Sequence, residues 1–209
     1  MKYWHVIWDW NGTLLDDAWL FIEVLKGMLA DRNLPPVSAE HYAQIFGFPV
    51  KDYFQKAGFD FKREPFTKIN DEFFGEYERR KLECRLREGA VEILSEIIGR
   101  GITQSILSAS PQIYLDEVVK FFDLEGFFIA RHGLEDNVAF GKVDVGLQWL
   151  SELGLPPNQI LMVGDTIHDH EVAGTLGVDC ILIPGGHQDR RRLEATGVPV
   201  IDSLAELDF

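Results

Sequence analysis

The sequence predicts an α/β protein with a doubly wound parallel sheet and an all-helical insertion after the first strand. From Gly89 onward, short apolar runs alternate with helical patterns, which is typical of a parallel sheet covered by helices on both faces. A further apolar run lies at residues 6–8, and residues 16–85 between these parts carry helical patterns without a strand signal. We therefore expect an α/β core of residues 1–15 and 86–209 and a helical domain of residues 16–85.

The first strand and the insertion follow from apolar spacing and from helix-breaking residues. The run at residues 6–8 reads as a buried strand that ends at Asp9, and Asn11 with Gly12 turns the chain. Ser38 is expected to cap the second helix of the insertion, and Gly58 to end the third. The helices predicted here span roughly residues 18–31, 39–45, 51–57 and 66–77.

The remaining elements alternate between helix and strand. Ser110 followed by Pro111 predicts a helix start, with the serine as N-cap and the proline in the first helical position. The helices of this part are expected near residues 90–98, 111–122, 142–153, 169–176 and 190–195. The strands are expected at residues 102–107, 127–130, 160–163 and 180–183, with a short edge strand at 199–201.

Composition excludes several classes of function. The chain carries 20 basic and 34 acidic residues, a net charge of −14, so nucleic acids and anionic membranes are poor partners. Cys84 and Cys180 have no metal-binding spacing, which argues against a zinc site and a disulfide scaffold. The sequence shows neither a leader segment nor an apolar run of about 18 residues. We expect a cytoplasmic protein.

Polar residues follow several of the predicted strands, and parallel strands place such ends at one edge of the sheet. Three of them, Asp9, Asp165 and Asp169, are carboxylates, and all-oxygen ligands favour Mg²⁺. The other residues of this group are Asn11, Ser108 and Lys142.

Three of these residues have a purely structural alternative. Asp169 could be a helix cap, Ser108 a turn serine and Lys142 a surface lysine. His168 is expected at the periphery rather than as a metal ligand, and residues 185–187 as a flexible loop.

These residues resemble the haloacid dehalogenase superfamily. Its first motif, DxDGT, is matched by residues 9–13, which read DWNGT, and its fourth, GDxxxD, by residues 164–169. Ser108 and Lys142 match the second and third motifs. The helical insertion looks like the small helical cap of the family, and residues 184–187 and 202–207 resemble phosphoglycolate phosphatase-like members.

The resemblance implies a Mg²⁺-dependent phosphatase of a small phosphorylated metabolite. Asp9 would be the nucleophile that forms an aspartyl phosphate. Ser108, Ala109 and Lys142 would hold phosphoryl oxygens, and Lys142 and Asn11 would also belong to the catalytic group. The metal would be held by Asp9, the backbone carbonyl of Asn11, Asp165 and Asp169. The cap would close over the site.

Asn11 departs from the family pattern, because the phosphatases have Asp there as the proton donor. An amide transfers no proton, and such transfer is typically worth ~10²–10⁴-fold in rate, so the resemblance implies weakened acid–base catalysis unless Asp16 or Asp17 supplies the proton. One alternative is a binding or regulatory protein with little turnover. Another is an Asn placed there by design to trap the intermediate. The substrate and the choice between monomer and homodimer stay open.

Overall fold

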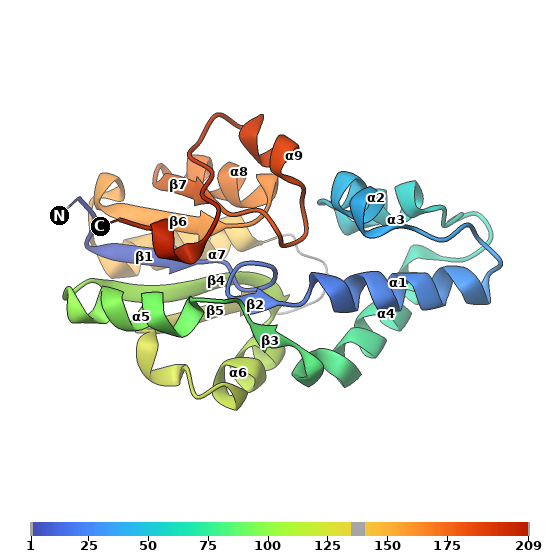
Figure 1. The fold of residues 1–209 in the computed structure, drawn as a ribbon, viewed down its shortest axis with the longest axis horizontal. Coiled ribbons are helices and arrows are strands. Elements are labelled where there is room, and N and C mark those ends of the chain that lie inside the picture. The colour runs from blue at the N-terminus through green and yellow to red at the C-terminus, as the bar shows by residue number, and fades with distance from the viewer. Residues whose placement is uncertain (1, 135–140, 209) are drawn as a thin grey trace.

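A computed structural model of the chain describes residues 2–134 and 141–208. A five-stranded sheet in the order β5-β4-β1-β6-β7 forms its centre, and all neighbouring strands pair in parallel (Figure 1). The strands are β1 (His5–Trp8), β4 (Thr103–Pro111), β5 (Ala130–Leu134), β6 (Ile160–Gly164) and β7 (Asp179–Leu182). The predicted α/β class with a parallel sheet is confirmed.

Helices cover both faces of this sheet because successive side chains of a strand point to opposite sides. Val6 and Trp8 of β1 belong to the apolar cluster shared with α5 and α6, whereas Ile7 belongs to the cluster shared with α7 and α8. The helices of this part are α5 (Ala90–Gly99), α6 (Gln112–Phe121), α7 (Lys142–Leu153), α8 (Ile167–Leu176) and α9 (Arg190–Glu194). Short 3₁₀ turns span Lys81–Glu83, Glu125–Phe127, Pro157–Gln159 and Leu204–Glu206.

Four helices lie beyond the carboxyl ends of the strands (Figure 1). They are α1 (Ala18–Asp31), α2 (Ala39–Ile45), α3 (Val50–Ala57) and α4 (Phe66–Arg80). The chain enters and leaves this helical domain through an antiparallel ribbon of β2 (Leu15–Asp16) and β3 (Arg85–Leu86). The domain boundaries drawn from the sequence stay a prediction, and residues 1, 135–140 and 209 of the predicted core lie outside the described residues.

Ser38 caps a helix as predicted, but Ser110 does not. The Ser38 Oγ accepts a hydrogen bond from the backbone N–H of His41 at 3.1 Å. Strand β4, by contrast, continues through Ser110 to Pro111, because an irregularity in the ladder lets Pro111 pair with Leu134. The helix that follows has Pro111 at its cap position, without a side-chain cap. Ser110 is thereby free to point elsewhere.

Two predicted strands also differ from the structure. The strand expected at 127–130 begins only at Ala130, and Phe127 belongs instead to the 3₁₀ turn that precedes it. Over residues 199–201 a single bridge joins Val200 to Leu182, so apolar character there reflects packing rather than a strand. In the described part of the chain, no helix is both long enough and apolar enough to cross a membrane.

Candidate active site

Three buried carboxylates meet at the carboxyl edge of the sheet. Asp9 directly follows β1 and Asp165 directly follows β6, while Asp169 lies in the first turn of α8. These side chains are 6%, 0% and 2% exposed, and each offers an oxygen atom within 4.8 Å of the other two. The sheet therefore brings together residues that lie up to 160 positions apart, as the sequence predicted.

Lys142, the first residue of α7, supplies the positive charge of this cluster. Its Nζ donates to the Oδ1 of Asp9 at 2.6 Å and to the Oδ1 of Asp169 at 2.7 Å. The side chain is only 2% exposed. The alternative of a surface lysine is therefore wrong. The interaction with two carboxylates offsets the free-energy cost of burying the ammonium group.

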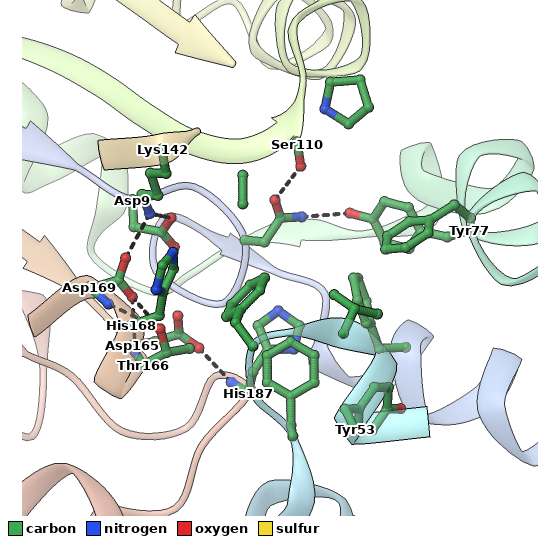
Figure 2. Close-up of a pocket in the computed structure, with 18 of the residues that line it drawn as sticks. Asp9, Tyr53, Tyr77, Ser110, Lys142, Asp165, Thr166, His168, Asp169 and His187 are labelled. Carbon is green, nitrogen blue, oxygen red and sulfur yellow. Dashed lines mark hydrogen bonds and ion pairs between the residues drawn. The ribbon is translucent and has the colours of Figure 1, made fainter. Parts of the chain in front are cut away.

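Asp169 has a structural task as well as a place in the cluster. Thr166 is the N-cap of α8, and its N–H and Oγ both donate to the Oδ2 of Asp169, at 3.0 and 2.7 Å. Asp169 is thus the partner in a capping box rather than the cap itself. Its Oδ1 points to Lys142 and remains part of the cluster (Figure 2).

The electrostatics of the cluster fit a divalent cation. Burial, with repulsion among the carboxylates, raises the pKa of Asp9 and of Asp165 above the usual range. Burial alone would also raise the pKa of Asp169, but Lys142 lowers it. Three buried carboxylates face one ammonium group, and an all-oxygen donor set of this kind suits Mg²⁺. The Asn11 carbonyl as a further metal ligand stays a prediction.

The loop at residues 184–188 packs against these carboxylates more tightly than the sequence suggested. The N–H of His187 donates to the Oδ2 of Asp165 at 2.5 Å. At Gly186 an added Cβ would collide with the Asp165 carboxylate and with the carbonyl of Gly12, and at Gly12, whose φ is +72°, it would collide with Asp165 and His187. His187 is 2% exposed, so the expectation of a flexible loop is wrong at this residue.

Asn11 is held by a hydrogen-bond network that the sequence did not reveal. Its Nδ2 donates to the Oδ2 of Asp17 at 2.6 Å and to the hydroxyl of Tyr77 at 2.8 Å, and its Oδ1 accepts from Ser110 at 2.6 Å (Figure 2). Tyr77 in turn donates to the Oδ2 of Asp17 at 2.7 Å. Every hydrogen-bonding position of the Asn11 amide is used except one carbonyl lone pair.

The fully buried Asp17 stands at the centre of this network. Its Oδ1 accepts from the N–H of Gly12 at 2.8 Å and lies 3.3 Å from the Nε2 of His187. Burial alone would raise the pKa of Asp17, but His187 and the hydrogen bonds lower it. Burial opposes protonation of His187, yet Asp17 and the other carboxylates raise its pKa to about 8. The pattern of polar residues at strand ends gave no signal for these two, because neither ends a strand.

Ser108 and Ala109 occupy the end region of β4. Ser108 is 1% exposed, and its Oγ accepts a hydrogen bond from the N–H of Ser110 at 3.1 Å. Ala109 and Ser110, rather than Ser108, line the cavity beside Asp9. His168 also lines this cavity, where its ring packs on that of Phe48 with 4.7 Å between the ring centres.

Arg87 is a further residue that the sequence did not single out. Its guanidinium donates to the carbonyl of Gly12 and to that of Pro184, both at 2.7 Å. It thereby joins the turn after Asp9 to the loop that contacts Asp165. A lone arginine after β3 carries no sequence signal for this role, since the two carbonyls meet only in the folded chain.

Comparisons with known proteins identify relatives of the whole chain. A family model described as haloacid dehalogenase-like hydrolase matches residues 6–183. A 5'-nucleotidase of Pseudomonas aeruginosa is 27% identical over 201 residues, which cover 93% of this chain and 89% of that protein. A phosphoglycolate phosphatase of Synechococcus elongatus is 22% identical over 204 residues, with 91% and 88% covered.

The fold has close counterparts among solved structures. The crystal structure of a predicted phosphatase from Clostridium acetobutylicum superposes with a TM-score of 0.83 at 20% identity, over 99% of this chain and 96% of that one. The family match extends from β1 to the end of β7 and includes Asp9, Lys142, Asp165 and Asp169. On this evidence the chain belongs to the haloacid dehalogenase-like hydrolases, as the sequence motifs predicted.

Proposed function

We propose that the protein is a Mg²⁺-dependent phosphatase that hydrolyses a small phosphorylated metabolite through an aspartyl phosphate on Asp9. The observation that carries this proposal is the buried cluster of Asp9, Asp165 and Asp169 around Lys142, at the wall of a cavity lined by both parts of the chain. Relatives named as a 5'-nucleotidase and as a phosphoglycolate phosphatase support the choice of reaction.

Asp9 is suited to the first step because its carboxylate is fixed in position. The Nζ of Lys142 and the Oγ1 of Thr13 bind its two oxygens, at 2.6 and 3.1 Å. A carboxylate oxygen attacks phosphorus, an O–P bond forms, and the bond to the leaving oxygen breaks. Water then attacks the phosphorus atom and releases inorganic phosphate and free Asp9.

The surrounding residues hold the phosphoryl group and its charge. We assign the metal to Asp9, the Asn11 carbonyl, Asp165 and Asp169, where bound Mg²⁺ would neutralise the nucleophile and the phosphoryl oxygens. Lys142 adds a fixed positive charge beside Asp9. The amide of Ala109 and the hydroxyl of Ser108, whose proton is not used in the turn, are the remaining candidates for phosphoryl contacts.

Asn11 limits the rate in this scheme. Its amide transfers no proton to the leaving alkoxide, so substrates with poor leaving groups lose the ~10²–10⁴-fold that a general acid supplies. Aryl phosphates need less help, because the aryl oxygen leaves as a weaker base. We therefore expect a steep dependence of turnover on the leaving group.

The test is Asp9→Asn, measured as phosphate release from 4-nitrophenyl phosphate with Mg²⁺. We expect a loss of at least ~10³-fold, because no other described carboxylate combines the same position and contacts. Glu171→Gln, on the exposed face of α8, is the matched control and should keep the wild-type rate. Full activity of Asp9→Asn would refute the aspartyl-phosphate route.

The fully bonded Asn11 also favours a second function, that of a phosphoryl-ligand binding or regulatory protein with little turnover. Such a protein would form one aspartyl phosphate per chain and retain it. Multiple rounds of phosphate release per chain would exclude this alternative, whereas a burst of one equivalent would support it. The cytoplasmic location and the choice between monomer and homodimer stay predictions.

A further inference from the structure

The cavity beside Asp9 is walled by aromatic rings. Helices and loops on the helical side supply seven of them and α6 supplies an eighth: Phe21, Phe46, Phe48, Tyr53, Phe73, Phe74, Tyr77 and Tyr114. Figure 2 shows the carboxylate cluster on one side of this cavity and rings on the other. The surface that these residues leave open is mostly apolar. The phosphoryl site thus adjoins a region suited to apolar groups.

The wall is preformed because its rings pack on one another. Phe21 contacts Phe73 at 5.2 Å and Phe46 at 6.1 Å between ring centres, and Phe73 contacts Phe74 at 5.3 Å. Of the five phenylalanine rings, Phe21, Phe46 and Phe73 are buried beneath, whereas Phe48 and Phe74 remain partly exposed. A ligand therefore meets the two partly exposed rings on a rigid aromatic base, which lowers the entropic cost of binding.

The same cavity lacks a free cation for a second anionic group. Lys142 is the only lysine or arginine among its described lining residues, and Asp9 and Asp169 already bind it.

The basic residues at the end of α4 and just after it are engaged elsewhere. Arg79 pairs with Glu76, Arg80 with Glu23 and Glu83, and Lys81 with Glu117.

The two histidines of the cavity do not supply this charge. The ring of His168 packs on Phe48, and its Nδ1 lies 3.5 Å from a carboxylate oxygen of Glu171, so it is engaged with groups other than a ligand. His187 lies against Asp17 and hydrogen-bonds with Tyr42 through Nδ1 at 2.6 Å. A second carboxylate or phosphate in the leaving group would be desolvated here without a counter-charge, which is strongly unfavourable.

On the basis of the proposed function, we propose that the leaving group of the substrate carries an uncharged planar ring. The ring packs against Phe48 and Phe74, while the phosphoryl group meets Asp9 and Lys142. Aromatic rings gain from edge-to-face and offset contacts beyond the apolar area that they bury. Phosphomonoesters whose leaving group bears a second anion, such as phosphoglycolate, are disfavoured.

Three phosphomonoesters, assayed with Mg²⁺, separate the effect of a planar ring from that of a second charge in the leaving group. They are benzyl phosphate, cyclohexylmethyl phosphate and phosphoglycolate. The first two are primary alkyl esters of similar size, so a difference between them reports ring planarity rather than bulk. We expect kcat/KM for benzyl phosphate to exceed that for cyclohexylmethyl phosphate about threefold and that for phosphoglycolate at least tenfold. Equal or faster hydrolysis of phosphoglycolate would overturn the proposal.

Variants locate the effect in the cavity wall. Phe74→Ala should raise KM for benzyl phosphate about tenfold with little change for phosphoglycolate, and Phe74→Leu should lose only the planar preference. Phe121→Ala, a ring on α6 that is 55% exposed and outside the cavity, is the matched control. Val50→Lys, which adds a cation to the wall, should improve phosphoglycolate selectively. An unchanged preference in Phe74→Ala would contradict the assignment.

Binding separates this proposal from the proposed function. Benzylphosphonate and phosphonoacetate are not hydrolysed, and calorimetry with Mg²⁺ compares their affinities directly. We expect benzylphosphonate to bind at least tenfold more tightly, and the reverse order would overturn the ring preference whatever the turnover. If that binding order holds but no ester, including 4-nitrophenyl phosphate, is hydrolysed, the phosphatase function fails and the ligand class stands.

Discussion

At the scale of single residues, the hydrogen bond from the Asn11 amide to the Asp17 carboxylate decides which charge position 11 can carry. Asn11 donates to Asp17 at 2.6 Å, and Tyr77 has one proton, which it donates to the same Asp17 oxygen. Position 11, where the sequence resemblance leads us to expect a carboxylate, carries an amide, and a carboxylate lies beside it at position 17. An acid restored at position 11 would therefore face a second acid.

Asn11→Asp alone is expected to destabilise the protein. It replaces a donor to Asp17 by a second carboxylate, and the loss of a buried hydrogen bond to a charged group costs ~1.5–3 kcal/mol. Urea denaturation should show this loss. The double variant Asn11→Asp/Asp17→Asn restores a donor–acceptor pair, should recover stability, and should hydrolyse alkyl phosphates faster than the wild type. Equal stability of the single and double variants would contradict the pairing.

His5 gives a pH dependence that lies far from the carboxylate cluster. Its ring is fully buried on β1, between the hydroxyls of Thr103 and Ser105 at 2.7 and 2.8 Å. Burial lowers the pKa of His5 from 6.5 to about 4. The unfolded chain therefore binds the proton first as the pH falls, and stability present above pH 6.5 is lost between pH 6.5 and 4.

His5→Gln should remove this part of the pH dependence. The wild type is expected to lose up to ~3 kcal/mol more than the variant across the interval, from 1.36 kcal/mol per pKa unit. Chemical denaturation of both proteins at pH 7.5, 5.5 and 4.5 measures the difference, in which the shared titration of carboxylates cancels. Parallel curves for the two proteins would show that His5 is not the group responsible.

At the scale of elements, the loop after β7 and the turn after β1 pack against the carboxylates from two sides. The backbone of Gly186 approaches Asp165 so closely that no side chain fits, and Arg87 ties the carbonyls of Gly12 and Pro184 together. Arg87 thus joins two segments that are far apart in the sequence. The positions of the carboxylates depend on these loops as well as on the strands.

Gly186→Ala should therefore impair the site more than the fold. The added methyl group displaces the Asp165 carboxylate, and we expect Mg²⁺ affinity and turnover to fall by at least ~10-fold, in the range seen when groups that orient ligands are lost. Gly174→Ala is the matched control, because this exposed glycine of α8 has no atom within 4 Å of an added Cβ. The Gly174→Ala variant should be more stable than the wild type by about 1 kcal/mol and should keep its Mg²⁺ affinity. Wild-type Mg²⁺ affinity in Gly186→Ala would contradict the steric argument.

At the scale of the whole molecule, polar contacts hold the helical domain over the sheet. The hydroxyl of Tyr42 on α2 bonds with His187, and Arg192 on α9 donates to the carbonyl of Phe46 at 2.6 Å. On the other side the buried Lys81 pairs with Glu117 of α6 at 2.7 Å. These contacts enclose the cavity between the two parts of the chain.

Mg²⁺ should stabilise the entire fold, because the carboxylates that would bind it come from two strand ends and a helix. With free Mg²⁺ at 100 times its Kd, binding to the folded state raises the free energy of unfolding by about 2.7 kcal/mol. Differential scanning calorimetry should show a higher Tm with Mg²⁺ in the wild type and little change in Asp165→Asn. A Tm that does not depend on Mg²⁺ in the wild type would contradict the metal assignment.

The elements that periodicity predicts well are those whose apolar pattern is long or is bounded by clear breaks. The parallel sheet, the helices of both parts and the Ser38 cap agree with the prediction. The comparisons confirm the family. Ser110 was wrongly predicted as a cap because a serine before proline has the same local signal whether or not tertiary pairing extends the preceding strand. The late start of β5 has another cause, since an apolar residue such as Phe127 can pack against the core from a 3₁₀ turn as well as from a strand.

The sequence by itself determined the succession of strands and helices along the chain and the polar residues that follow the strands. Motif spacing and the alternation of apolar patterns report local backbone structure. Only the tertiary structure decided that Asp17, Tyr77 and His187 surround Asn11 and that aromatic rings wall the cavity. Tyr42 and His187, for example, meet across 145 positions. Such contacts follow from how helices pack on one another and on loops, and no local pattern in the sequence encodes that distance.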